Sequence, residues 1–245
     1  MTHPTAAPQL KVLVFAASLR AESHNRKLAA LAARVAAQAG AAVDLAWMND
    51  FDVPLYDGDL EKAEGIPAGA QELQKRLLAS DAFIVASPEY NASMPGTIKN
   101  LIDWTSRFRP QPFDGRHGLL LSASPSLAGG NRGLWALRVP LEHLGARIFP
   151  DMFSLAMAHK AFAGDQLADE ALRGRFEKTL QAFLSLAEEL DPCSLHARVV
   201  LRRLRKRQER LHVLLKAGAE RRVGNVIVDE RLVRHSQREH IGKDP

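Results

Sequence analysis

The 245-residue chain is 46% hydrophobic, which is enough for one sizeable α/β domain with an appendage. It has no apolar stretch of about 18 residues and no basic-then-apolar leader, so neither a membrane span nor a signal peptide is expected. Its single cysteine, Cys193, excludes a disulfide within one chain and a cysteine-based metal cluster, and it favours a cytoplasmic location.

The net charge of +5 is unevenly distributed along the chain. The segment from Asp191 onward holds 14 of the 33 basic residues and 7 of the 28 acidic ones, a charge of +7. The part before Asp191 therefore carries −2. Basic character belongs to the C-terminal segment, so it says little about the function of the main part of the chain.

The first elements of the chain alternate between strand and helix. Residues 10–16 (LKVLVFA) have the apolar character of a buried strand, and a polar loop follows them. A helix rich in Ala and Leu is expected over 25–39, because Gly40 is a natural helix end. A weaker strand is expected over 42–45, and 49–69 should be mostly loop because it is rich in Asp, Pro and Gly.

The middle of the chain repeats this alternation. Pro67 is expected to begin a helix that runs to Ser80, since proline is favoured in the first turn. A buried strand is predicted over 82–86 (AFIVA). The spacing of apolar residues predicts a helix over 97–107, and 117–123 (HGLLLSA) should form a fourth strand.

The last elements complete the pattern. A helix is predicted over 134–144, a fifth strand over 146–149, and an amphipathic helix over 170–190. Strand and helix thus alternate about five times, which predicts a doubly wound parallel sheet.

The loop after the first predicted strand, residues 17–24, has the composition of an anion site. It leads into the N-terminus of a helix, where unpaired N–H groups and the helix dipole attract negative charge. The hydroxyls of Ser18 and Ser23 and the guanidinium of Arg20 would add donors. The alternative is that Ser23 or Asn25 merely caps the helix.

The stretch 87–104 (SPEYNASMPGTIKNLIDW) carries the most informative loop of the chain. Pro88 and Pro95 restrict the backbone at two points, so this loop should be stiff. Tyr90 offers a flat apolar face, and Asn91 and Ser93 offer polar contacts, a combination that suits a planar ligand rich in heteroatoms. The alternative is an ordinary strand-to-helix connection.

A third loop, residues 124–133, follows the fourth predicted strand. Gly129 and Gly130 permit a close backbone approach there, although composition alone favours a plain loop. In a flavodoxin-type sheet the loops after strands one, three and four open at one edge, beside the topological switch point. Together they describe a mononucleotide site. Neither the G-x-G-x-x-G nor the Walker A pattern occurs at these loops.

On these residues the chain resembles the NADPH-dependent FMN reductase family of flavodoxin-like proteins, which includes quinone and chromate reductases. The matching stretches are ASLRAESHNRKLA at 17–29 and the motif at 87–104, with weaker support from the loop around Gly129 and Gly130. The resemblance implies an α/β, flavodoxin-like doubly wound sheet of five parallel strands, order 2-1-3-4-5, with helices on both faces. One departure is Ala17, where the family usually has glycine, so the shape of the phosphate turn is open.

The resemblance also implies which residues hold the cofactor. The FMN phosphate would be bound by Ser18, Arg20, Ser23 and Asn25. The isoalloxazine would be lined by Pro88, Glu89, Tyr90, Asn91 and Ser93, with Ser124 and Gly129 closing its other side. Glu89 is expected to orient its loop by hydrogen bonding rather than to act as a functional acid. His24 and His117 are expected to be surface or packing residues.

The implied reaction is ping-pong hydride transfer from NADPH or NADH, through flavin N5, to a quinone-like or other small acceptor. No side chain is assigned a catalytic role, and no metal site is expected. The competing hypothesis is a flavodoxin, a non-enzymatic electron carrier. Flavodoxins are typically acidic and lack an arginine in the phosphate loop, so Arg20 and the near-neutral main part favour the enzyme.

The predicted domain organisation has three parts. Residues 1–9 form a flexible N-terminus, 10–190 form the FMN-binding domain, and 191–245 form a basic extension that is disordered or partly helical. The resemblance implies a homodimer or homotetramer. No membrane partner is expected; no nucleic-acid partner is expected either, although the basic extension leaves that question open.

Overall fold

The computed structural model describes residues 9–190, which lie within the first of two units of the chain, Met1–Asp191 and Pro192–Pro245. The predictions for the flexible N-terminus and for the basic extension 191–245 lie outside the described residues. The boundary after residue 190 therefore stays a prediction.

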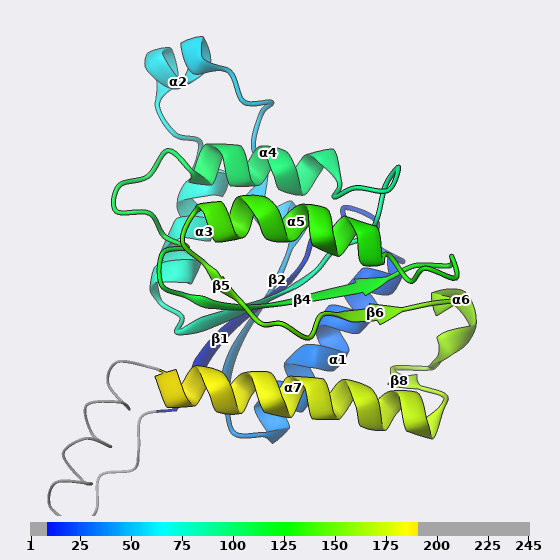
Figure 1. Cartoon of the computed structure of the whole chain (residues 1–245). Helices are drawn as coiled ribbons and strands as arrows, with labels where there is room; N and C mark the ends of the chain where they lie inside the picture. The colour runs from blue at the N-terminus through cyan, green and yellow to red at the C-terminus, as the bar shows by residue number, and fades with distance from the viewer. Residues whose placement is uncertain (1–8, 191–245) are drawn as a thin grey trace, which may run out of the picture. The chain divides into compact units, whose positions relative to one another are not determined.

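A parallel sheet forms the centre of the described part, in the order β2-β1-β3-β4-β5 (Figure 1). This confirms the predicted fold class and strand order. Strands β3 and β4 have the predicted bounds, whereas β2 continues two residues further than expected. The strands are β1 Lys11–Ala16, β2 Ala42–Trp47, β3 Ala82–Ala86, β4 His117–Ala123 and β5 Arg147–Ile148.

Helices cover both faces of the sheet (Figure 1). Successive side chains of β1 point to opposite faces because a strand has a period of two. Val12 and Val14 pack with one set of helices, whereas Leu13 and Phe15 pack with the other. The first face is covered by α1 His24–Gln38 and α7 Glu170–Leu190, and the second by α3 Ala68–Leu78, α4 Gly96–Thr105 and α5 Asn131–His143.

The segment expected to be mostly loop contains two short helices. A 3₁₀ turn, η1 Met48–Phe51, buries Phe51, and helix α2 Gly58–Glu64 buries no residue at all. Local capping stabilises α2, since Asp57 accepts a hydrogen bond from the Asp59 N–H and acidic residues occupy the first turn. The composition of residues 58–64 predicts a loop, but the capping interactions stabilise a helix there.

Strand β5 is shorter than predicted. A further strand, β6, which the sequence analysis did not predict, continues the same edge of the sheet. Strand β5 pairs with the start of β4, and β6 Phe153–Leu155 pairs with its end. Beyond β6 lie the short helix α6 Ala158–Ala161 and a hairpin of β7 Phe162–Ala163 and β8 Gln166–Leu167. These elements have only two to four residues each, too few for a sequence period to show.

Candidate functional site

Three loops leave the carboxyl ends of the adjacent strands β1, β3 and β4, as the sequence analysis predicted. We call them the first loop (17–23), the middle loop (87–95) and the glycine loop (124–130). Sheet hydrogen bonding continues into two of them: the Ala17 N–H donates to the Ala86 carbonyl (2.9 Å), and the Ser87 N–H donates to the Leu121 carbonyl (2.8 Å). The loops therefore start side by side at one edge, where open α/β sheets bind ligands.

The first loop leads into the N-terminus of α1, which concentrates positive charge. Ser23 is the N-cap, and its hydroxyl accepts a hydrogen bond from the Asn25 N–H (3.2 Å). No acidic residue stands in the first turn of the helix. Ser18 is buried, whereas Arg20 is exposed and makes no ion pair with any residue between 9 and 190. The positive helix end and the free guanidinium suit an anion.

His24, the first residue of α1, lies close to these positive charges. Burial lowers the pKa of its imidazole, and the nearby charges of Lys27, Arg20 and His159 lower the pKa further. Nδ1 of His24 is buried and has no hydrogen-bond partner within the described part, and the ring stacks on Phe162 with centroids 6.4 Å apart. The sequence analysis treated His24 as a surface or packing residue, and the stacking shows that it packs.

Asn25 connects the first loop to the end of β4. Its side-chain amide donates to the Ala123 carbonyl (2.9 Å), and its side-chain oxygen accepts from the Ala123 N–H (2.9 Å). The residue is only 2% exposed. The side chain assigned to the phosphate by resemblance thus joins two loops of the site, and it holds the N-terminus of α1 against the sheet.

The tip of the middle loop is a tight hairpin that presents Tyr90. The N–H of Tyr90 donates to the Ser93 carbonyl (2.9 Å), and the N–H of Ser93 donates to the Tyr90 carbonyl (3.0 Å). Asn91 and Ala92 both have positive φ, at 51° and 60°, which costs about 1 kcal/mol for alanine. The Tyr90 side chain is 51% exposed, so this turn holds an aromatic ring at the surface, while Pro88 behind it is buried.

Glu89 anchors the middle loop to α5. One carboxylate oxygen accepts from Nε (2.9 Å) and Nη2 (2.6 Å) of Arg132, and the other accepts from the Gly133 N–H (3.1 Å). Burial raises the pKa of Glu89, but the hydrogen bonds from Arg132 and Gly133 outweigh it, so the pKa lies below its usual range. The orienting role expected for Glu89 is therefore present in the structure.

Arg132 and Gly133 were not singled out from the sequence. The signal that could have identified Arg132 is its opposite charge to Glu89, combined with the neighbouring positions of their two loops. A Cβ at Gly133 would come within 3.1 Å of Glu89 and of the Ser93 carbonyl, so a larger residue would push the two elements apart. This close approach explains the glycine.

The glycine loop turns sharply into α5. Gly129 and Gly130 have φ of 64° and 86°, a conformation that glycine adopts without strain. A Cβ at Gly130 would overlap the Ser122 hydroxyl. Ser124 is half-buried, and its hydroxyl accepts from the Ser126 N–H (3.2 Å).

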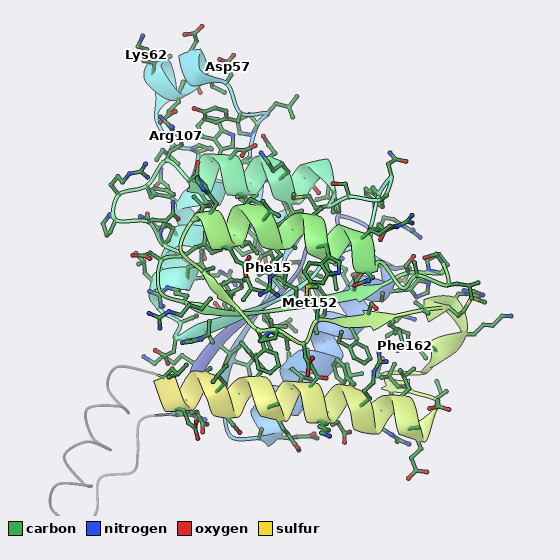
Figure 2. The ribbon with its side chains drawn as sticks, in the orientation of Figure 1. Phe15, Asp57, Lys62, Arg107, Met152 and Phe162 are labelled. Carbon is green, nitrogen blue, oxygen red and sulfur yellow. The ribbon has the colours of Figure 1, made fainter. Side chains whose placement is uncertain are left out.

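A segment that the sequence analysis missed also borders the site. The Ala158 N–H donates to the Ser124 carbonyl (3.0 Å), and the Met157 N–H donates to the Ser126 carbonyl (3.2 Å). Through Phe162 the same segment packs on His24 of α1. Residues 156–162 therefore link the glycine loop to the start of α1, near Phe162 in Figure 2.

Residues 9–190 show neither a metal-ligand cluster nor a membrane-spanning helix. No group of three or more His, Cys, Asp or Glu side chains in that range is arranged to hold a metal ion. None of the helices described there has the length and apolarity of a membrane span.

Residues 10–160, more than half of the chain, match the family model described as NADPH-dependent FMN reductase. The chain belongs to this family. An NAD(P)H-dependent FMN reductase of Pseudomonas aeruginosa is 36% identical over 177 residues, which cover 71% of this chain and 92% of that protein. A quinone reductase of Escherichia coli is 36% identical over 140 residues, 57% of this chain and 73% of that protein.

Among solved structures, the flavoenzyme NAD(P)H:(acceptor) oxidoreductase FerB from Paracoccus denitrificans has a TM-score of 0.63 and 29% sequence identity. The match covers 74% of this chain and 98% of that one. Family membership, the fold and the three-loop edge agree, and the protein is an FMN-dependent NAD(P)H oxidoreductase.

Proposed function

We propose that the three loops hold FMN, with its phosphate at the first loop and its ring between the middle and glycine loops. The observation that carries this proposal is the pair of Asn25–Ala123 hydrogen bonds, since they join the cationic N-terminus of α1 to the strand that leads into the glycine loop. The exposed Tyr90 lies on the loop after β3, the strand between β1 and β4, which supports a phosphate site and a ring site at one sheet edge.

The residues present fit a mononucleotide. For a phosphate, the structure offers the free guanidinium of Arg20, the hydroxyls of Ser18 and Ser23, and a helix N-terminus without acidic residues. Asn25 uses its amide within the protein, so its proposed role is to position the loop. For the ring, the proposal keeps Pro88, Glu89, Tyr90, Asn91, Ser93, Ser124 and Gly129 as the lining residues.

The chemistry that FMN supplies when bound is hydride acceptance and donation. The residues of this chain then bind and orient: Glu89 holds the middle loop against α5, and the Tyr90 hairpin presents an apolar surface to a planar substrate. NADPH or NADH and a quinone-like acceptor are proposed to use this open edge in turn. The acceptor class rests on the relatives named as quinone reductases.

An absorbance spectrum tests the function. Purified protein reconstituted with FMN should show flavin bands that bleach on anaerobic addition of NADPH or NADH and return when a quinone is added. Bound flavin that both nicotinamides leave oxidised would indicate a flavodoxin-type carrier instead. Failure to bind FMN at all would remove the three-loop assignment.

Two further expectations stay proposals. A cytoplasmic location rests on the single cysteine, Cys193, which favours a reducing compartment. A homo-oligomer rests on the family resemblance.

A further inference from the structure

A pocket of about 270 Å³ lies where β4 and β5 begin, at the end of β4 away from the glycine loop. Its walls are mostly apolar and come from β5, from the residues that follow it and from α7. Phe149 and Phe183 both line it and pack edge to face, with ring centroids 5.7 Å apart. The other apolar lining residues are Ile148, Pro150, Leu186 and Leu190. Apolar walls with a few polar groups are typical of small-molecule sites.

His117, the first residue of β4, is the buried polar side chain of this pocket. It is only 6% exposed, and its Nε2 atom has no hydrogen-bond partner within the described part. Leu119 and Leu121 pack in the core that includes α1 and α7, so His117, two positions earlier in the strand, points to the same side. Buried polar atoms normally have a partner. The free nitrogen therefore indicates a position at which a bound molecule would complete a hydrogen bond.

Arg147 places a positive charge beside His117. The two residues are register partners in the parallel pair of β4 and β5, so their side chains lie on one face of the sheet. Burial, and then the charge of Arg147, lowers the pKa of His117, so the imidazole is neutral at pH 7 and carries one N–H. The Arg147 side chain is exposed and makes no ion pair with any residue between 9 and 190. A neutral donor and a free guanidinium thus lie side by side.

The acidic side chain in the lining, Glu142 of α5, already has a partner. It pairs with Arg138 one turn earlier in the helix (2.8 Å). Arg138 also donates to the carbonyls of Ile148 (3.2 Å) and Phe149 (3.4 Å), which holds the pair at the edge of the pocket. The charge of Glu142 is therefore neutralised locally, and the guanidinium of Arg147 stays available to an anion.

We propose that this pocket binds a small aromatic carboxylate, of which benzoate is the simplest form. The carboxylate would accept a hydrogen bond from Nε2 of His117 and pair with Arg147, while the ring would pack against Phe149 and Phe183. The volume lies just below the range of about 300–1,000 Å³ that is usual for drug-sized ligands, so it limits the body to about one ring. A monoanion suits the site better than a phosphate dianion, because a second charge between apolar walls would lose its hydration without a second cation.

The pocket is independent of the proposed FMN site, because the two lie at opposite ends of β4. Two leucines report on them separately. Leu186 lines the pocket, whereas Leu19 lies in the first loop and is 54% exposed. Nuclear magnetic resonance of leucine methyl groups therefore follows both sites in one titration. The full chain is used, since Leu190 borders the pocket and the residues after it lie outside the described part.

Benzoate should shift the Leu186 methyl resonances with a Kd of about 1 mM or tighter and leave those of Leu19 unchanged. Benzamide has the same ring without the charge and should bind about tenfold more weakly, because it forms no charge-assisted hydrogen bond. Sodium sulfate at matched ionic strength should leave Leu186 unchanged, since it has no apolar body. Arg147→Gln should weaken benzoate binding by about tenfold. Lys178→Gln, which removes an exposed cation of α7 outside the lining, is the matched control and should change nothing.

His117→Phe keeps an aromatic ring but removes the N–H, so it too should weaken benzoate binding by about tenfold. Circular dichroism verifies that each variant is folded. If the buried substitution prevents folding, the exposed Arg147→Gln still decides the question.

Several results would overturn the proposal. The absence of a Leu186 shift at about 10 mM benzoate would do so, as would a benzoate shift at Leu19 alone. Equal affinities for benzoate and benzamide, or for the natural protein and Arg147→Gln, would remove the anion from the assignment. Sulfate that binds as tightly as benzoate would remove the apolar body. Failure of FMN to shift Leu19 would instead count against the proposed function and leave the pocket untouched.

Discussion

The side-chain amide of Asn25 and the peptide group of Ala123 form a closed pair of hydrogen bonds, each 2.9 Å long, across 98 residues of sequence. Both partners are buried. This pair holds the start of α1 at the end of β4. The geometry of the proposed anion site therefore depends on Asn25, although Asn25 does not contact the ligand in our proposal.

Replacing Asn25 with alanine should destabilise the protein by about 3 kcal/mol, because the Ala123 N–H and carbonyl would be left buried without partners. For a domain of this size, the midpoint of thermal unfolding should then be roughly 10 °C lower. FMN affinity should fall as well. Asn49→Ala, which removes an exposed amide with one hydrogen bond, is the control. An unchanged melting temperature for Asn25→Ala would contradict the structural role.

Replacing Arg20 with alanine should weaken FMN binding by about tenfold to a hundredfold, since a charge-assisted hydrogen bond contributes about 1.5–3 kcal/mol. Riboflavin lacks the phosphate, so its affinity should not change. Flavin fluorescence quenching measures both constants. The control is Lys62→Ala, which removes an exposed cation of α2. Equal losses for FMN and riboflavin would place Arg20 elsewhere than at the phosphate.

The ion pair of Glu89 makes a contribution to stability that depends on pH. Because its pKa in the folded protein is depressed, this contribution is present above the unfolded value, near 4.3, and is lost as the pH falls through the folded pKa. Glu89→Gln should therefore be less stable than the natural protein at pH 7, and the difference should shrink toward pH 3. Urea unfolding at both pH values measures it, and a constant difference would refute the assignment.

FMN binding should depend on pH through His24. Without ligand the pKa of His24 is lowered, by burial and then by Lys27, Arg20 and His159, so the ring is neutral at pH 7. A phosphate dianion nearby would raise this pKa, so binding takes up a proton. The affinity then weakens as the pH rises from the pKa of the free protein to the pKa of the complex, by about tenfold for a shift of one unit.

His24→Phe keeps an aromatic ring against Phe162 but cannot be protonated, so its FMN affinity should vary less with pH. Riboflavin serves as the ligand control, because its affinity should be flat in both proteins. A natural protein whose FMN affinity stays constant over this range would remove His24 from the phosphate site. The phosphate itself titrates near pH 6, and the His24→Phe variant separates that contribution because it binds the same ligand.

Deletion of residues 191–245 should leave FMN binding intact, because every residue of the proposed site lies between 18 and 129. The truncated protein is compared with the full chain by fluorescence titration and by thermal unfolding. Loss of FMN binding by a folded truncated protein would move the domain boundary beyond residue 190.

Local sequence determined the fold class and indicated the loops at which we propose the site. Strands β3 and β4 have the predicted bounds because each is a short run of buried apolar residues between clear turns. The middle loop could also be identified from local sequence, because its prolines, tyrosine and polar side chains are adjacent in the chain. These signals depend on residues a few positions apart.

The tertiary structure decided which partners these residues meet. The Asn25–Ala123 pair and the Glu89–Arg132 pair join residues 98 and 43 positions apart, and neither has a periodic signature. The same holds for the division of the sheet edge between β5 and β6 and for the packing of Phe162 on His24. Hydrogen bonds across such distances form only after the sheet has brought the loops together, so packing, and not local preference, selects them.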